Sequence, residues 1–205
     1  MKIQPRNRRL GILLSGRGSN FEAIAANIDE GKLDAEIAIV ISNVEAAPGL
    51  FRARERGLHT AFVPSRGMMR EHFDTELVGL LKKNDVGLIV LAGFMRIFSP
   101  VLLAAYSNLI LNIHPALLPS FPGLDVHQQA LDYGVKYSGC TVHFVNGELD
   151  GGPIISQAAV PVLNDDTAAT LSARILKEEH RIFSEAIAMI LSGKCEIQGR
   201  RVLCR

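Results

Sequence analysis

Short runs of consecutive apolar residues alternate, over the first half of the chain, with stretches whose apolar residues recur every three or four positions. The apolar runs predict strands at Leu10–Leu14, Ala35–Ile41, His59–Val63, Gly87–Leu91 and Leu109–Ile113. The intervening stretches predict helices at Phe21–Glu30, Ala47–Glu55, Met69–Lys82 and Pro100–Ala105. Strands that are apolar throughout are typical of a parallel sheet covered by helices on both faces. This order predicts a doubly wound, mostly parallel α/β fold.

The pattern changes after residue 114. Three prolines within His114–Asp125 predict an extended, stiff loop. A short helix is expected over Val126–Tyr133. Strands at Thr141–Val145 and Ile154–Val160 flank a turn-rich segment, and they predict a β-hairpin that extends the sheet.

The last part of the chain has the pattern of a long amphipathic helix followed by a short tail. The helix is expected to begin near Asp166 or Thr167, either of which can cap it, and to end near Gly193. Lys194–Arg205 is expected to add a small strand, and the arm Met1–Arg9 to be frayed. A chain of 205 residues with no visible linker fits a single domain, 1–205.

Composition and charge narrow the class of protein. Apolar residues make up 48% of the chain, which excludes disorder as the dominant state. The net charge of +1 does not favour a nucleic-acid partner. No apolar run is long enough for a membrane span or a signal peptide. Cys140, Cys195 and Cys204 are odd in number and scattered, which argues against a disulfide framework and a zinc site. We expect a soluble, reduced, cytoplasmic protein without a metal.

A glycine-rich segment, Gly16-Arg-Gly-Ser-Asn20, follows the first predicted strand and opens the first predicted helix. Glycines let the backbone approach a ligand closely, and free N–H groups at a helix start attract anions. The third glycine of a dinucleotide fingerprint and the lysine of a Walker loop are both missing. The segment therefore predicts a site for a single phosphate. The alternative is a plain turn capped by Ser19 or Asn20.

Asn112 and His114 stand two residues apart at the end of the fifth predicted strand, so they point to the same face. Ligands of open α/β sheets bind beyond the carboxyl ends of strands. An amide and an imidazole there suit a carbonyl that becomes an oxyanion. Asp150 lies in the later turn-rich segment, where periodicity alone cannot place it beside His114.

Glu179 interrupts the apolar stripe of the long helix, so its carboxylate must be paired inside the protein or face a ligand. The alternative to a ligand is a buried ion pair with an arginine. Arg96 follows the fourth strand at its carboxyl end, beside Ile97 and Phe98, whereas Arg70 has the position of a solvated helix residue.

Four motifs occur in order along residues 9–192. They are Ser15-Gly-Arg-Gly-Ser-Asn20, Leu91-Ala-Gly-Phe-Met-Arg-Ile97, Leu111-Asn-Ile-His-Pro-Ala-Leu-Leu-Pro119 and Glu148-Leu-Asp-Gly-Gly-Pro153. In this order and spacing they resemble the folate-dependent formyltransferases. The resemblance is strongest to the branch that moves a formyl group from 10-formyltetrahydrofolate to the amine of phosphoribosylglycinamide in purine biosynthesis.

The resemblance implies a catalytic triad of Asn112, His114 and Asp150. It further implies that Gly18, Ser19 and Asn20 hold the substrate phosphate in the N-terminal half of the chain, and that Glu179 contacts the ribose. The implied folate pocket is lined by Arg70, Met95, Arg96, Ile97, Phe98, Asn112, Asn146, Gly147, Glu148, Leu149 and Asp150. The partners would be these small molecules, with no membrane or nucleic acid, and the protein a monomer or a homodimer.

Three other interpretations stay open. A formyltetrahydrofolate hydrolase shares the triad, but usually carries an N-terminal regulatory domain, which the few residues before the first strand do not provide. A methionyl-tRNA formyltransferase requires a C-terminal RNA-binding domain. A non-catalytic nucleotide- or folate-binding module would be expected to lack Asn112, His114 or Asp150, and all three are present.

Overall fold

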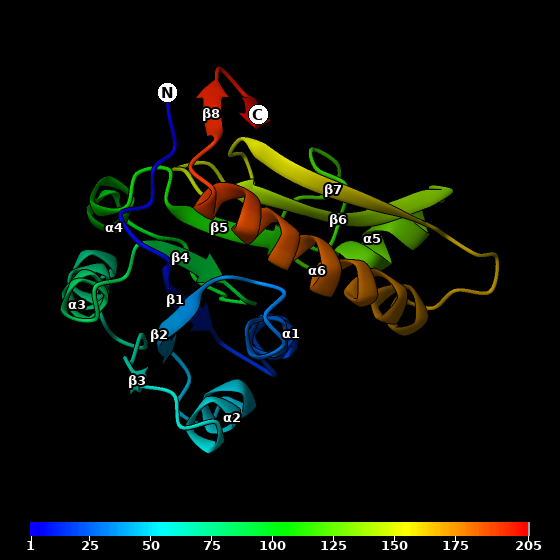
Figure 1. Ribbon diagram of the computed structural model, residues 1–205. Coiled ribbons are helices and arrows are strands. Elements are labelled where there is room, and N and C mark those ends of the chain that lie inside the picture. The colour runs from blue at the N-terminus through cyan, green and yellow to red at the C-terminus, as the bar shows by residue number, and fades with distance from the viewer. Residues whose placement is uncertain (205) are drawn as a thin grey trace.

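The computed structural model describes residues 1–204, so Arg205 of the predicted tail lies outside the described residues. The elements in chain order are β1 (Arg9–Leu14), α1 (Ser19–Asp29), β2 (Glu36–Ser42), α2 (Pro48–Glu55), β3 (Thr60–Phe62), α3 (Arg70–Lys83), β4 (Leu88–Leu91), α4 (Pro100–Ala105), β5 (Ile110–His114), α5 (Val126–Tyr133), β6 (Tyr137–Phe144), β7 (Ile154–Pro161), α6 (Ala168–Leu191), β8 (Cys195–Gln198) and β9 (Arg201–Cys204). Figure 1 shows them arranged around one twisted sheet.

The strands form a nine-stranded sheet in the order β3-β2-β1-β4-β5-β6-β7-β9-β8. The first five strands are parallel, as the sequence predicts. β6 is antiparallel to both β5 and β7, and β7 is parallel to β9. The predicted hairpin is therefore confirmed, with β6 beginning earlier, at Tyr137. The long helix is also confirmed, and the Thr167 side chain caps it by accepting a hydrogen bond from the backbone N–H of Thr170.

Helices bury both faces of the parallel strands, which explains why these strands are apolar throughout. In β1, Leu10, Ile12 and Leu14 pack in the core formed with α1, α2 and α6, where Phe21 and Phe183 are also buried. Leu13 belongs to the core on the opposite face, with α3 and α4. Side chains alternate between the two faces of a strand, so one continuous apolar run supplies both cores.

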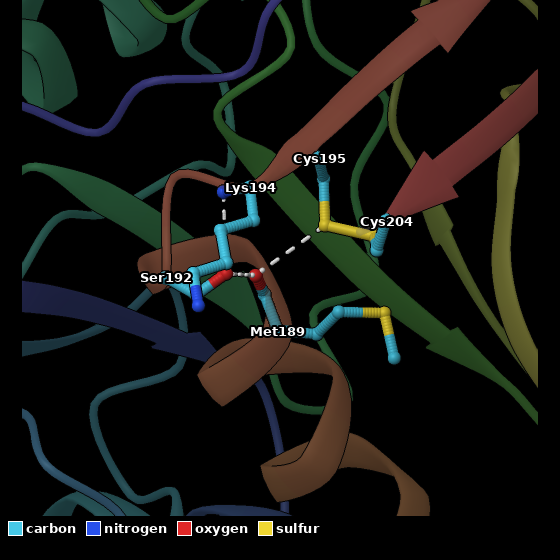
Figure 2. Close-up of a disulfide and its surroundings, with 5 residues drawn as sticks. All are labelled: Met189, Ser192, Lys194, Cys195 and Cys204. Atoms are coloured by element: carbon cyan, nitrogen blue, oxygen red, sulfur yellow. Dashed lines mark hydrogen bonds between the residues drawn. A yellow bond between two sulfur atoms is a disulfide. The ribbon is translucent and has the colours of Figure 1, made fainter.

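The C-terminal tail differs from the sequence-based expectation. It forms two strands, β8 and β9, and Cys195 and Cys204 stand opposite each other in their register and form a disulfide (Figure 2). The prediction that the cysteines form no disulfide was therefore wrong, because spacing along the chain does not reveal which cysteines a hairpin brings together. Cys140 is a free, buried cysteine.

The prediction of a frayed N-terminal arm was also wrong. The backbone N–H of Ile3 donates to the Cys195 carbonyl at 3.0 Å, and the Met1 amino group donates to the Ile197 carbonyl at 2.6 Å. Ile3 is buried in the larger core. The arm thus adds backbone pairing to the free edge of β8, which is why it is ordered.

Candidate active site

The polar residues that the sequence singles out gather beyond the carboxyl ends of the parallel strands. β5 ends at His114, and Asn112 lies on the same face of that strand. The sequence predicts an extended loop after His114, and this prediction was wrong. The segment folds into turns and contains a cis Leu118–Pro119 peptide. Thr141 of β6 fixes this segment, since its hydroxyl donates to the Ala116 carbonyl at 2.7 Å and accepts from Leu118 N–H at 3.0 Å.

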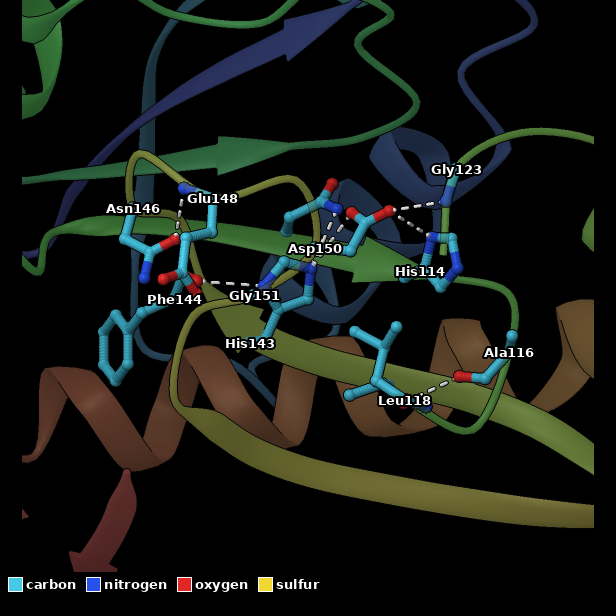
Figure 3. Close-up of polar contacts among 12 residues, drawn as sticks. His114, Ala116, Leu118, Gly123, His143, Phe144, Asn146, Glu148, Asp150 and Gly151 are labelled. Atoms are coloured by element: carbon cyan, nitrogen blue, oxygen red, sulfur yellow. Dashed lines mark hydrogen bonds and ion pairs between the residues drawn. The ribbon is translucent and has the colours of Figure 1, made fainter. Parts of the chain in front are cut away.

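The imidazole of His114 is held between two hydrogen-bond acceptors. Its Nε2 lies 2.8 Å from the carbonyl oxygen of Phe121, and its Nδ1 lies 3.5 Å from Oδ2 of Asp150. The Phe121 carbonyl on one side and the Asp150 carboxylate on the other therefore fix the orientation of the ring. Figure 3 shows the ring and the carboxylate facing each other.

Asp150 reaches this position from the loop between β6 and β7. The backbone N–H of Gly123 donates to its Oδ2 at 2.9 Å, and its side chain is only 10% exposed. Two residues later the chain passes so close to β6 that a Cβ on Gly152 would lie 1.7 Å from the Phe144 carbonyl oxygen. Glycine is required there, and the close approach brings the carboxylate beside His114.

His143 also belongs to this cluster, although nothing in its sequence context predicted it. Its Nδ1 lies 2.9 Å from the Phe144 carbonyl oxygen, its Nε2 lies 3.1 Å from Nδ2 of Asn112, and the same Nε2 lies 3.7 Å from Oδ1 of Asp150. Burial lowers the pKa of His143. A neutral ring with its proton on Nδ1 satisfies the first two contacts.

The signal that could have revealed His143 is the register of the sheet. β5 and β6 pair with Asn112 directly opposite His143, and residues opposite each other in an antiparallel pair have neighbouring side chains. The sequence predicts the strand but not this register.

The glycine-rich segment lies at the start of α1, as predicted. Gly18 has a φ of 75°, and a Cβ there would lie 2.8 Å from the Cα of Gly49. No side chain caps α1, so the alternative of a turn capped by Ser19 or Asn20 is wrong. The N–H groups of the first turn lack acceptors within the helix and are available to an anion.

Glu179 of α6 is buried, as predicted, beside this segment. Its Oε2 accepts a hydrogen bond of 2.7 Å from Nδ2 of Asn20, so the alternative of an ion pair with an arginine is wrong. Burial raises the pKa of Glu179, and the Asn20 hydrogen bond opposes the shift. Oδ1 of Asn20 is buried without a hydrogen-bond partner in the protein, which leaves one acceptor open to a ligand.

The segment after β4 presents some predicted pocket residues and buries others. Met95 is 63% exposed and Ile97 is 54% exposed. Phe98 packs in the core against Phe94, with ring centroids 5.5 Å apart. The Arg96 guanidinium donates to the carbonyls of Ser65 and Met68, so it ties down the loop that leads to Arg70, the first residue of α3.

A buried carboxylate supports the same segment from α3. Oδ2 of Asp74 accepts hydrogen bonds from the backbone N–H and the hydroxyl of Ser99, the residue that caps α4. Burial raises the pKa of Asp74, and these bonds and the charges of Arg96 and Arg70 oppose the shift.

The loop before Asp150 is exposed from Asn146 to Leu149, and Leu149 is 60% exposed. Within it, the Asn146 side chain accepts a hydrogen bond of 2.9 Å from the backbone N–H of Glu148. Exposed apolar side chains thus occur both in the segment after β4 and in the loop that leads to Asp150.

A model of the formyl transferase family matches residues 8–187. The chain belongs to this family. The phosphoribosylglycinamide formyltransferase of Escherichia coli (strain K12) is 42% identical over 187 residues, which cover 91% of this chain and 88% of that protein. The solved structure of glycinamide ribonucleotide transformylase 1 from Symbiobacterium toebii is similar too, with a TM-score of 0.95, 48% identity and coverage of 98% and 95% of the two chains.

This formyl transferase also matches part of a larger protein. Over 203 residues it is 41% identical to the trifunctional purine biosynthetic protein adenosine-3 of Bos taurus. The matched region covers 98% of this chain but 20% of that protein. Within residues 1–204, no group of three or more His, Cys, Asp or Glu side chains could hold a metal ion. In the same part of the chain, no helix is both long and apolar enough to cross a membrane.

Proposed function

We propose that this formyl transferase moves the formyl group of 10-formyltetrahydrofolate to the amine of phosphoribosylglycinamide, a step of purine biosynthesis. The observation that carries the proposal is the meeting of His114 and Asp150 at the end of β5, with Asn112 on the same strand, in a chain of this family. An amide donor and a protonated imidazole on one strand suit a developing oxyanion.

The ribonucleotide would bind in the N-terminal half of the site. Its phosphate would meet the backbone N–H groups of Gly18, Ser19 and Asn20, where a helix start favours negative charge. Its ribose would meet the buried carboxylate of Glu179. The unpartnered Oδ1 of Asn20 supports this assignment, because a buried polar atom without a partner is costly unless a ligand satisfies it.

The reduced folate would bind between the segment after β4 and the loop 146–150. Exposed Met95, Ile97 and Leu149 fit a flat, partly apolar ring system better than a small polar substrate. Arg70 would add a positive charge for a carboxylate. Arg96 and Phe98 would contribute backbone only, since their side chains are engaged within the protein.

Formyl transfer needs a new bond from the amine nitrogen to the formyl carbon and cleavage of the bond from that carbon to N10 of the folate. Between these events the formyl oxygen carries negative charge. The second N–H of the Asn112 amide would donate to that oxygen, since its Nδ2 also faces His143. A protonated His114 ring, oriented by Asp150, would stabilise the oxygen through its charge. The proton that the amine loses passes to N10, through His114 or through a water beside Asp150.

The test is to incubate the purified protein with 10-formyltetrahydrofolate and to follow release of tetrahydrofolate with and without phosphoribosylglycinamide. Release that requires the ribonucleotide is the expected result. Equal release without it would instead make the protein a formyltetrahydrofolate hydrolase. Folate binding with no release in either case would leave a non-catalytic binding module.

A further inference from the structure

The hairpin of β8 and β9, the tail hairpin, contacts the loop 146–152. This loop carries Asp150 and is called the catalytic loop below. Nη2 of Arg200, in the turn between β8 and β9, donates a hydrogen bond of 3.0 Å to the carbonyl oxygen of Gly151. Gly151 directly follows Asp150, which faces His114. β9 also pairs with β7 through Arg201 and Ile154. A residue at the far end of the sequence thus contacts the backbone beside the proposed catalytic carboxylate.

Backbone hydrogen bonds hold both ends of the catalytic loop, from Gly151 N–H to the Glu148 carbonyl at 3.3 Å and from Phe144 N–H to the Pro153 carbonyl at 2.9 Å. Residues 146–149 are exposed, and Asp150 has a φ of 49° in the left-handed region. Aspartate tolerates this conformation better than most non-glycine residues, but the conformation still costs free energy that the surroundings must offset. The Gly123 N–H fixes the Asp150 carboxylate, whereas the Arg200 guanidinium fixes the peptide on its other side.

The disulfide closes the hairpin that presents Arg200. β8 and β9 have four residues each, and so short a hairpin is marginal by itself. The Cys195–Cys204 bond joins its two open ends, and Cys204 is exposed whereas Cys195 is buried (Figure 2). A cross-link of this kind restricts the conformations that the segment can adopt.

We propose that Arg200 is a positioning residue for the Asp150 loop, and that the Cys195–Cys204 disulfide controls how firmly the hairpin presents it. A dithiol would break the bond between the two sulfurs, giving each of them a proton and leaving the reductant as a disulfide. The freed hairpin would then hold the Gly151 carbonyl less tightly. The expected effect on turnover rests on the proposed formyl transfer, but the coupling of hairpin to loop does not.

Substitutions in the hairpin turn test the positioning role. Arg200→Gln is expected to lower kcat about fivefold with little change in the KM for the ribonucleotide, since a loosened catalytic group slows the reaction more than it weakens remote binding. Arg200→Lys keeps a charged donor on a side chain long enough to reach the Gly151 carbonyl, which the shorter Gln does not, and should recover most of kcat. Arg201→Gln, which removes the same charge one residue later, should match the wild type. Wild-type kcat in Arg200→Gln, or an equal loss in Arg201→Gln, would overturn the role.

Hydrogen exchange tests the disulfide without relying on activity. Treating the wild type with dithiothreitol should speed amide exchange in a peptide covering 146–152, and Cys204→Ser should show the fast rate with or without the dithiol. In the Arg200→Gln variant the loop should exchange fast before reduction. Unchanged loop exchange in a wild type whose two thiols are shown by alkylation to be free would refute the control by the disulfide. If reduction speeds exchange in the loop but the protein transfers no formyl group, the proposed function is contradicted and the coupling of hairpin to loop is not.

Discussion

Burial raises the pKa of Glu179 and lowers the pKa of His143. Both shifts favour the uncharged form, because a buried charge loses its hydration. The second imidazole of the site, His114, lies between the Phe121 carbonyl and the Asp150 carboxylate. Asp150 thus has an imidazole on each of its two carboxylate oxygens.

Replacing Glu179 by Gln should stabilise the protein at neutral and higher pH. A carboxyl group whose pKa is raised by folding contributes fully to stability below its unfolded-state pKa, and that contribution is lost as the pH rises through the folded-state pKa. Each tenfold difference in proton affinity between the folded and unfolded states corresponds to about 1.4 kcal/mol. Melting curves at about pH 8 should therefore favour Glu179→Gln, and the difference should shrink toward about pH 4. Equal differences at both pH values would contradict the raised pKa.

Replacing Asp150 by Asn should remove the charge that faces the His114 ring while keeping an acceptor for Gly123. Because the His114 ring loses the carboxylate that faces it, kcat is expected to fall by about 100-fold or more, with smaller changes in both KM values. Steady-state kinetics measures this. Asp125→Asn, at an exposed position in the neighbouring loop, is the control and should retain activity. Near-wild-type turnover in Asp150→Asn would count against its catalytic role.

At the scale of elements, close approaches between backbones place the site. The turn into α1 packs against α2, where Gly18 meets Gly49, and the β6–β7 loop packs on β6, where Gly152 meets Phe144. At both places a glycine permits the contact, because a Cβ there would overlap the facing backbone.

Gly18→Ala tests the first of these approaches. The new Cβ would lie 2.8 Å from the Gly49 Cα at a φ of 75°, so α1 would have to shift and carry the proposed phosphate site with it. We expect a loss of about 1–3 kcal/mol in unfolding free energy and a higher KM for the ribonucleotide. Gly57→Ala shares the positive φ but meets nothing within 4 Å, so it isolates the backbone strain. Equal losses in both variants would show that the contact is unimportant.

At the scale of the whole molecule, one sheet joins the proposed phosphate site to the tail. The parallel strands provide the carboxyl ends where the site lies, and β6 and β7 connect them to the disulfide-closed hairpin. The N-terminal arm pairs with β8, so the two ends of the described chain meet at this edge of the sheet (Figure 1).

The three cysteines should respond differently to a thiol reagent. Burial raises the pKa of Cys140 to about 12, so its thiol stays protonated and unreactive at neutral pH. The folded, oxidised protein should take up no alkylating reagent, and reduction should expose Cys195 and Cys204 alone. Mass spectrometry after alkylation counts the labels. Labelling of Cys140 in the folded protein would contradict its burial.

Much of the fold could be predicted because burial on both faces leaves a continuous apolar run in each parallel strand. Asn112 and His114 could be predicted as partners, since two residues apart on a strand share a face. Periodicity could not predict the meeting of Asp150 with His114, which only the family resemblance implied, nor the presence of His143, because both depend on the register of antiparallel pairs. The Cys195–Cys204 bond and the ordered N-terminal arm were missed because both depend on pairing in the tail.

The sequence by itself determined the α/β class, the order of the elements and the chemical groups available at the strand ends, since these follow from local periodicity and residue type. Only the tertiary structure decided which groups meet. It placed Asp150 and His143 around His114, Asn20 on Glu179 and Arg200 on Gly151. The physical reason is that each meeting joins segments far apart in the chain, and their distance is fixed by sheet register and helix packing.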